Sequence, residues 1–163
     1  MTANAESQLV SIATQLIGTK CWQVSAGGSV GSRFVLDFGK QLEWEPVENP
    51  RVNEMFKDKR KGELTVNVGC AAWRLDGEDE PITSWTDIAG LNGPMVDGLR
   101  LLNGCTVTMA QIMRPGLDLI LTFDNKLCLR VFCDQFEEPY DNYNLSHQNT
   151  YVSVMARSRI VVS

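Results

Sequence analysis

Apolar and polar positions alternate in short runs along most of the chain, and this period-two pattern is typical of β-strands. Turn-forming residues separate the runs, as expected for an antiparallel arrangement of neighbouring strands. The pattern predicts strands over about 21–25, 33–38, 64–73, 106–113, 117–123, 126–134 and 151–162.

Two segments have helical rather than alternating spacing. The apolar residues between Leu9 and Ile17 recur at three- and four-residue intervals, which predicts an amphipathic helix. A second helix is expected to begin at Pro94, a good first-turn residue, and to end before Gly104. The predicted fold class is therefore α+β, an antiparallel β-rich sheet with two helices packed on it.

The chain also resembles itself. Each helix ends at a glycine, Gly18 or Gly104, and a cysteine, Cys21 or Cys105, follows at nearly the same distance. Three strand-like runs come next in both halves. We therefore expect a single domain over residues 1–163 built by duplication of a helix-plus-three-strand unit. The repeats cover about 5–85 and 94–162, with an inserted loop at about 43–63 in the first repeat.

Composition and charge narrow the class of function. The 163 residues are 44% hydrophobic and carry a formal net charge of −5, which fits a globular chain and disfavours direct nucleic-acid binding. The apolar runs are too short to span a membrane, and residues 1–7 lack the basic region of a signal peptide. The five cysteines form no CxxC pair, as in reduced intracellular proteins. A cytoplasmic location is expected.

No pattern of catalytic or metal-binding residues stands out, so no catalytic group, metal or cofactor is predicted. His147 is the only histidine, and one histidine without a neighbouring cysteine does not make a typical zinc site. The glycine-rich segment 27–32 precedes a strand rather than a helix, which favours a hairpin loop over a phosphate loop. A pair formed through space by His147 with Cys70 or Cys133 stays open as a route to catalysis.

Acidic residues and aromatic residues occur together in two places. One group follows the strand that ends near Trp73, and the other follows the strand that ends near Asp134. Tyrosine and tryptophan beside carboxylates are common at protein interfaces, although solvated loops anchored by buried aromatics would give the same composition. The predicted partner-binding residues are Trp73, Asp76, Glu78, Asp79, Glu80, Trp85, Glu137, Glu138, Asp141 and Tyr143.

Three segments carry a resemblance to a family. They are 21–39, 70–85 and 131–143, which contain Cys70-Ala71-Ala72-Trp73 and Val131-Phe132-Cys133-Asp134-Gln135. These segments resemble a widespread set of small uncharacterised bacterial proteins, and small acidic proteins of that kind are often similar to immunity proteins of toxin systems. The resemblance implies a binding role and assigns no site residue.

Three hypotheses follow. The first is a non-catalytic protein-binding domain, immunity- or antitoxin-like, that neutralises a partner protein such as a basic toxin through its acidic and aromatic loops. The second is a structural or self-assembling β-rich protein that forms a homodimer through the strand at 151–162. The third is a small-ligand binder or enzyme that uses cysteine or histidine.

Overall fold

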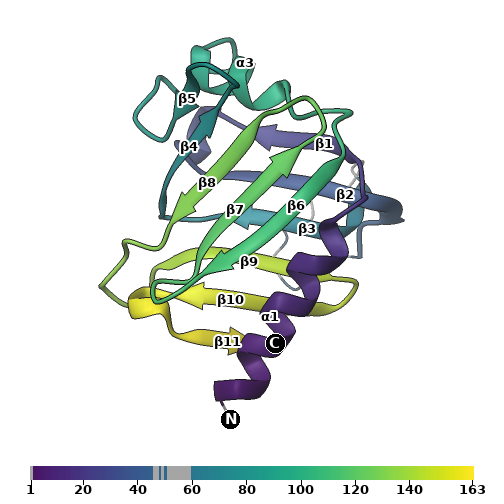
Figure 1. Ribbon diagram of the computed structural model, residues 1–163, viewed down its shortest axis with the longest axis vertical. Helices are drawn as coiled ribbons and strands as arrows, with labels where there is room; N and C mark the ends of the chain where they lie inside the picture. The colour runs from purple at the N-terminus through teal and green to yellow at the C-terminus, as the bar shows by residue number, and fades with distance from the viewer. Residues whose placement is uncertain (1, 46–47, 49, 51–59) are drawn as a thin grey trace.

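The computed structural model describes residues 2–45, 48, 50 and 60–163 (Figure 1). Two α-helices and two antiparallel sheets make up these residues, which confirms the α+β class. Helix α1 spans Thr2–Leu16 and helix α3 spans Pro94–Arg100. No helix in the described part of the chain is long and apolar enough to cross a membrane.

The larger sheet has six strands. Its order is β1 (Cys21–Ala26), β2 (Phe34–Glu43), β3 (Arg60–Val68), β9 (Asp141–His147), β10 (Thr150–Met155) and β11 (Ile160–Val162). The second sheet has five strands. Its order is β5 (Pro81–Ser84), β4 (Ala72–Asp76), β8 (Cys128–Phe132), β7 (Asp118–Phe123) and β6 (Val107–Met113).

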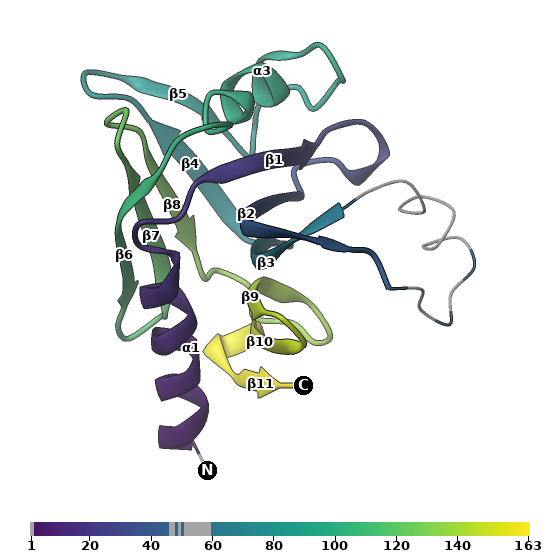
Figure 2. The same cartoon turned by 90° about the vertical axis from the view of Figure 1, so that its right-hand side faces the viewer.

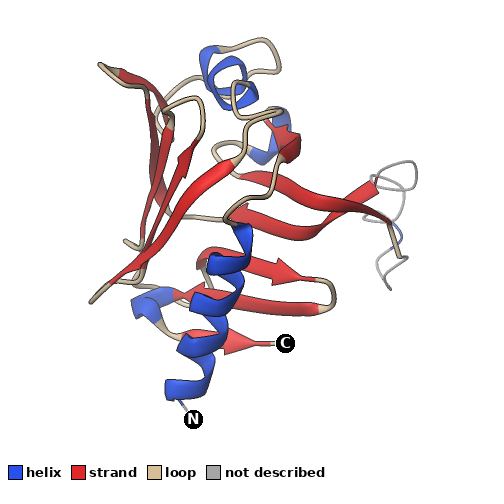
Figure 3. Ribbon diagram, turned by 45° about the vertical axis from the view of Figure 1, so that its right-hand side comes forward, coloured by secondary structure: helices blue, strands red, loops and turns tan. Residues whose placement is uncertain are grey.

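Each sheet combines strands from both halves of the chain. The meander β1-β2-β3 is extended by β9 and β10, whereas the meander β6-β7-β8 is extended by β4 and β5. Each half therefore begins with a helix and a three-stranded meander and then sends a hairpin to the opposite sheet. The strands form two sheets rather than one (Figure 3). Each sheet contributes buried apolar residues to a common core, so each covers the apolar face of the other.

The two halves meet in a reciprocal pair of backbone contacts. The N–H of Gly18 donates to Val107 O at 2.8 Å, and the N–H of Gly104 donates to Cys21 O at 2.7 Å. Both glycines have φ of +85°, a left-handed conformation that other residues adopt only with strain. These contacts place the ends of the two helical segments side by side. The duplication of a unit over 5–85 and 94–162 stays a prediction.

The core lies between the sheets. Leu36 and Val66 from the larger sheet and Leu121 and Leu129 from the smaller one are completely buried. Helix α1 lies along one open side of this space and contacts β6, β9, β10 and β11 (Figure 2). Helix α3 lies elsewhere, against β5 and β1.

Several predicted strands differ from the observed ones. The run 64–73 is two strands, because the chain leaves the larger sheet after Val68 and enters the smaller sheet at Ala72. The run 151–162 is also two strands, separated by a tight turn at Ala156–Ser158 that has no glycine or proline. Strand β9 occupies a segment in which no strand is predicted from the sequence. The inserted loop at 43–63 lies mostly outside the described residues.

Candidate functional site

A cleft of about 710 Å³ lies on the outer face of the six-stranded sheet, away from the core. The strand register brings its floor together, because residues directly opposite one another on adjacent strands project from the same face. Asp37, Thr65, Ser146 and Tyr151 form one such row across β2, β3, β9 and β10. The floor is thus made by side chains from both halves of the chain.

The floor of the cleft is polar and well ordered by hydrogen bonds. The hydroxyl groups of Thr65 and Ser146 lie 2.5 Å apart, and both side chains are buried. The buried carboxylate of Asp37 accepts a hydrogen bond from the N–H of Gly62 at 2.8 Å. A second row of the register adds Asn67 and Asn144, whose amides also line the cleft.

One end of the cleft combines cationic and aromatic side chains. It lies where the end of β2 pairs with the start of β3, and it contains Trp44, Arg60, Lys61 and Tyr151. The ammonium group of Lys61 donates to the hydroxyl of Tyr151 at 2.9 Å and lies 5.2 Å from the centre of its ring. This contact holds the lysine and the tyrosine together at the rim.

The other end of the cleft is bordered by Arg33 and by two exposed aliphatic residues, Val30 and Leu91. Arg33 immediately precedes β2, so it lies at the opposite end of that strand from Lys61. Its guanidinium donates to the Cys70 sulfur at 2.9 Å, and this hydrogen bond raises the pKa of the arginine. The cleft therefore has a cationic side chain at each end, and hydroxyl and amide groups and the buried carboxylate of Asp37 lie between them.

The predicted acidic residues do not form one surface. Asp76 lies opposite Cys128 at one end of β8, whereas Ala72 lies opposite Phe132 at the other end. The segment 76–80 therefore extends from one end of the smaller sheet, and the segment 134–141 leaves the other. In the order of elements, the segment 134–141 follows the meander β6-β7-β8 as the short link 69–71 follows β1-β2-β3, whereas 76–80 joins the two strands of the hairpin β4-β5.

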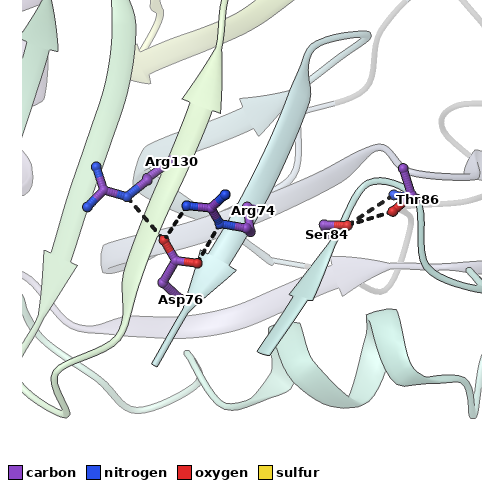
Figure 4. Close-up of polar contacts among 5 residues, drawn as sticks. All are labelled: Arg74, Asp76, Ser84, Thr86 and Arg130. Carbon is purple, nitrogen blue, oxygen red and sulfur yellow. Dashed lines mark hydrogen bonds and ion pairs between the residues drawn. The ribbon is translucent and has the colours of Figure 1, made fainter. Parts of the chain in front are cut away.

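Within the first acidic segment, Asp76 is held between two arginines on the outer face of the smaller sheet (Figure 4). Arg74 makes two hydrogen bonds to its carboxylate, at 2.6 and 3.1 Å, and Arg130 makes one at 3.1 Å. The hydrogen bond from Arg74 is the main cause of a lowered pKa for Asp76. Glu78 pairs with Lys126 at 2.8 Å, while Asp79 and Glu80 are exposed.

Replacing Asp76 by asparagine is expected to lower the melting temperature, because Arg74 and Arg130 are directly opposite on adjacent strands and would then repel one another. The decrease in melting temperature should be larger at about 10 mM salt than at about 1 M, where the repulsion between the arginines is screened. Thermal unfolding followed by circular dichroism at both salt concentrations measures this decrease. The matched control is Asp79→Asn, which removes the same charge from an exposed position. Equal shifts for the two variants would contradict the prediction.

In the second acidic segment the carboxylates are near the surface. Glu138 pairs with Arg159 at 2.9 Å, and Glu137 is exposed. Asp141 is partly buried at the start of β9, where its carbonyl accepts the N–H of Cys70. The charged members of the predicted set are thus at least partly accessible, but they are divided between the two ends of the smaller sheet.

Two predicted contact residues are not on the surface. Trp73 and Tyr143 both have 0% exposure, so they are corrected from partner contacts to core residues. Trp73 donates from its indole to Ser32 O at 2.8 Å, and Tyr143 donates from its hydroxyl to Leu117 O at 2.8 Å. Large aromatics with one polar group commonly pack in this way. Trp85 is 49% exposed and remains available for contact.

The residues considered for catalysis are not gathered in the cleft. Cys70 lies beside the start of β9 and His147 is the last residue of that strand, so β9 separates them. Cys133 donates its thiol to Leu117 O and, like the other two, does not line the cleft. Within the described ranges, no group of three or more histidine, cysteine or acidic residues is arranged to hold a metal ion.

No family model matches this chain, and the searches of curated proteins and of solved structures found no match either.

Proposed function

We propose that the chain is a non-catalytic protein-binding domain, of the immunity or antitoxin type, and that it holds its partner at the cleft of the six-stranded sheet. The observation that carries the proposal is the composition of the cleft. Its rim contains Trp44, Tyr151, Arg33 and Arg60 around a floor of hydroxyl and amide groups and one buried carboxylate. Tryptophan, tyrosine and arginine are the side chains most enriched among residues that dominate binding energy at protein interfaces.

The geometry also supports a binding role through its rigidity. The floor belongs to four hydrogen-bonded strands, so its polar groups keep their spacing when a partner arrives. A preorganised surface loses less conformational entropy on association than a set of loops does. The exposed acidic residues of the two end segments then act at longer range, where they raise the association rate with a cationic region of the partner.

Site-specific photocrosslinking in an extract of the source organism tests this proposal. A benzophenone amino acid replaces Tyr151 or Leu91 at the cleft, which are 38% and 63% exposed. The control positions are Met109 and Met113 on the outer face of the smaller sheet, at 41% and 45% exposure. We expect one partner protein to crosslink from the cleft positions and not from the controls.

The outcomes separate the hypotheses. The same adducts from all four positions, or none from the cleft, would contradict the proposed surface. A crosslink from Tyr151 to a second copy of the chain would instead support self-association. The product of the gene adjacent to this one is the first partner to test with purified components.

A further inference from the structure

The cationic side chains of the cleft differ from most of those in the rest of the chain that the structure describes. Outside the cleft, ion pairs with carboxylates hold Arg74, Arg100, Arg114, Arg130 and Arg159. In the cleft, Arg33, Arg60 and Lys61 form no ion pair with any carboxylate of the described residues. Three positive charges are thus left available at one surface of a chain whose formal net charge is −5.

The cleft supplies little negative charge of its own. Asp37 is the one carboxylate among its described lining residues, and that group is buried in the floor, where it accepts the N–H of Gly62. The rim therefore presents positive charge to an incoming molecule, although the chain as a whole carries a formal net charge of −5.

We propose that the cleft binds an extended acidic segment of the partner protein, with its carboxylates at the Arg60 and Lys61 end and at Arg33. This inference rests on the proposed function and adds the chemistry of the bound segment. Arg33 and Lys61 lie at opposite ends of β2, so a segment that lies along this strand meets a cation at each end. The amides of Asn67 and Asn144 lie between them and can both donate to and accept from a peptide backbone.

A peptide fits these features better than a nucleic acid does. A polyanion that extends beyond the cleft would meet an acidic molecule, whereas nucleic-acid sites usually carry a broad basic surface. The aliphatic residues Val30 and Leu91 at the Arg33 end also suit apolar side chains that alternate with the acidic ones.

Hexaglutamate is the probe that tests the inference, with hexalysine and a six-residue oligothymidylate as comparisons. In a titration of the full chain followed by ¹⁵N–¹H NMR, we expect hexaglutamate to shift the signals of Asn67, Asn144 and Ser146 at low salt. The double variant Arg60→Gln/Lys61→Gln should bind about tenfold more weakly, since two partly exposed ion pairs together supply on the order of 1.4 kcal/mol. The control Arg114→Gln/Arg159→Gln removes the same charge outside the cleft and should bind normally.

Three outcomes would overturn the inference: shifts that map outside the cleft, equal weakening by the two double variants, or equal binding of the oligothymidylate, which would indicate a general polyanion site. Failure of this test is distinguishable from failure of the proposed function. If the cleft crosslinks a partner but hexaglutamate does not bind, the binding surface stands and the acidic chemistry is wrong.

Discussion

Truncating Trp73 to alanine is expected to lower the free energy of unfolding by about 3–5 kcal/mol, the usual cost of deleting a large buried aromatic side chain. Trp73 is 0% exposed and packs edge-on against Phe34 with 4.9 Å between ring centroids. Because the two residues come from β4 and β2, this contact joins the two sheets. Urea denaturation followed by circular dichroism measures the loss.

Two variants make the result specific. Trp73→Phe keeps an aromatic ring but removes the indole donor to Ser32 O, so it should cost about 1–3 kcal/mol. Trp85→Ala removes the same side chain from a position that is 49% exposed and should cost within about 0.5 kcal/mol. If Trp73→Ala cost no more than Trp85→Ala, the assignment of Trp73 to the core between the sheets would be wrong.

Stability is expected to fall steeply in alkali. Burial raises the pKa of the Cys21 and Cys133 thiols from 9.0 to about 12, and Asp118 and Asp134 add to the effect at Cys133. Both thiols stay neutral in the folded chain while they ionise near pH 9 in the unfolded chain. The contribution of the two neutral thiols to the free energy of unfolding is therefore complete below pH 9 and is lost as the pH rises toward 12.

The expected loss is large because two thiols act together. Above pH 9 each thiol lowers the free energy of unfolding by about 1.4 kcal/mol per pH unit, so the two together lower it by roughly 4 kcal/mol at about pH 10.5. Urea midpoints measured from neutral pH upward should show it. In the variant Cys21→Ala/Cys133→Ala the decline should become shallower, with Tyr143 and Cys105, whose pKa values burial also raises, contributing to the remainder. An unchanged slope in that variant would show that other groups control the alkaline transition.

Local patterns were sufficient to predict much of the fold. Alternation located β1, β2, β6, β7 and β8 to within a few residues, because each of these strands has one face in the core and one in a polar environment. The two helices were predicted from apolar spacing and from Pro94 and Gly104. The alternation of apolar and polar residues does not indicate which strand pairs with which. The exchange of hairpins between the two sheets therefore could not be predicted from it.

The differences between the predicted and the observed strands and contact residues have local causes. Strand β9 was interpreted as a loop because Asn142, Asn144 and Ser146 are residues typical of turns, although Asn142 and Ser146 are completely or almost completely buried. Trp73 and Tyr143 fit the prediction of contact residues because aromatic residues beside carboxylates are common at protein interfaces, but their positions in β4 and β9 direct the two rings inward.

One pattern in the sequence indicates the polar floor of the candidate cleft. Polar residues occupy every second position in Thr65-Val66-Asn67-Val68 and in Asn144-Leu145-Ser146. Such alternation on two strands indicates a polar sheet face, but only the pairing of β3 with β9 shows that the two polar rows are adjacent. The cationic residues of the rim are distant from one another in the sequence, so no local pattern indicates that they lie together.

The crossing of hairpins between sheets has a consequence for synthesis of the chain on the ribosome. Strand β3 emerges early, yet its partner β9 is translated only after the whole of the smaller sheet, with Leu64 pairing with His147. The edge of the first meander thus stays unpaired while the residues between Val68 and Asp141 are translated. Pairing between strands so distant in sequence is slow to form, so we expect this edge to be the part of the fold most prone to aggregation before synthesis is complete.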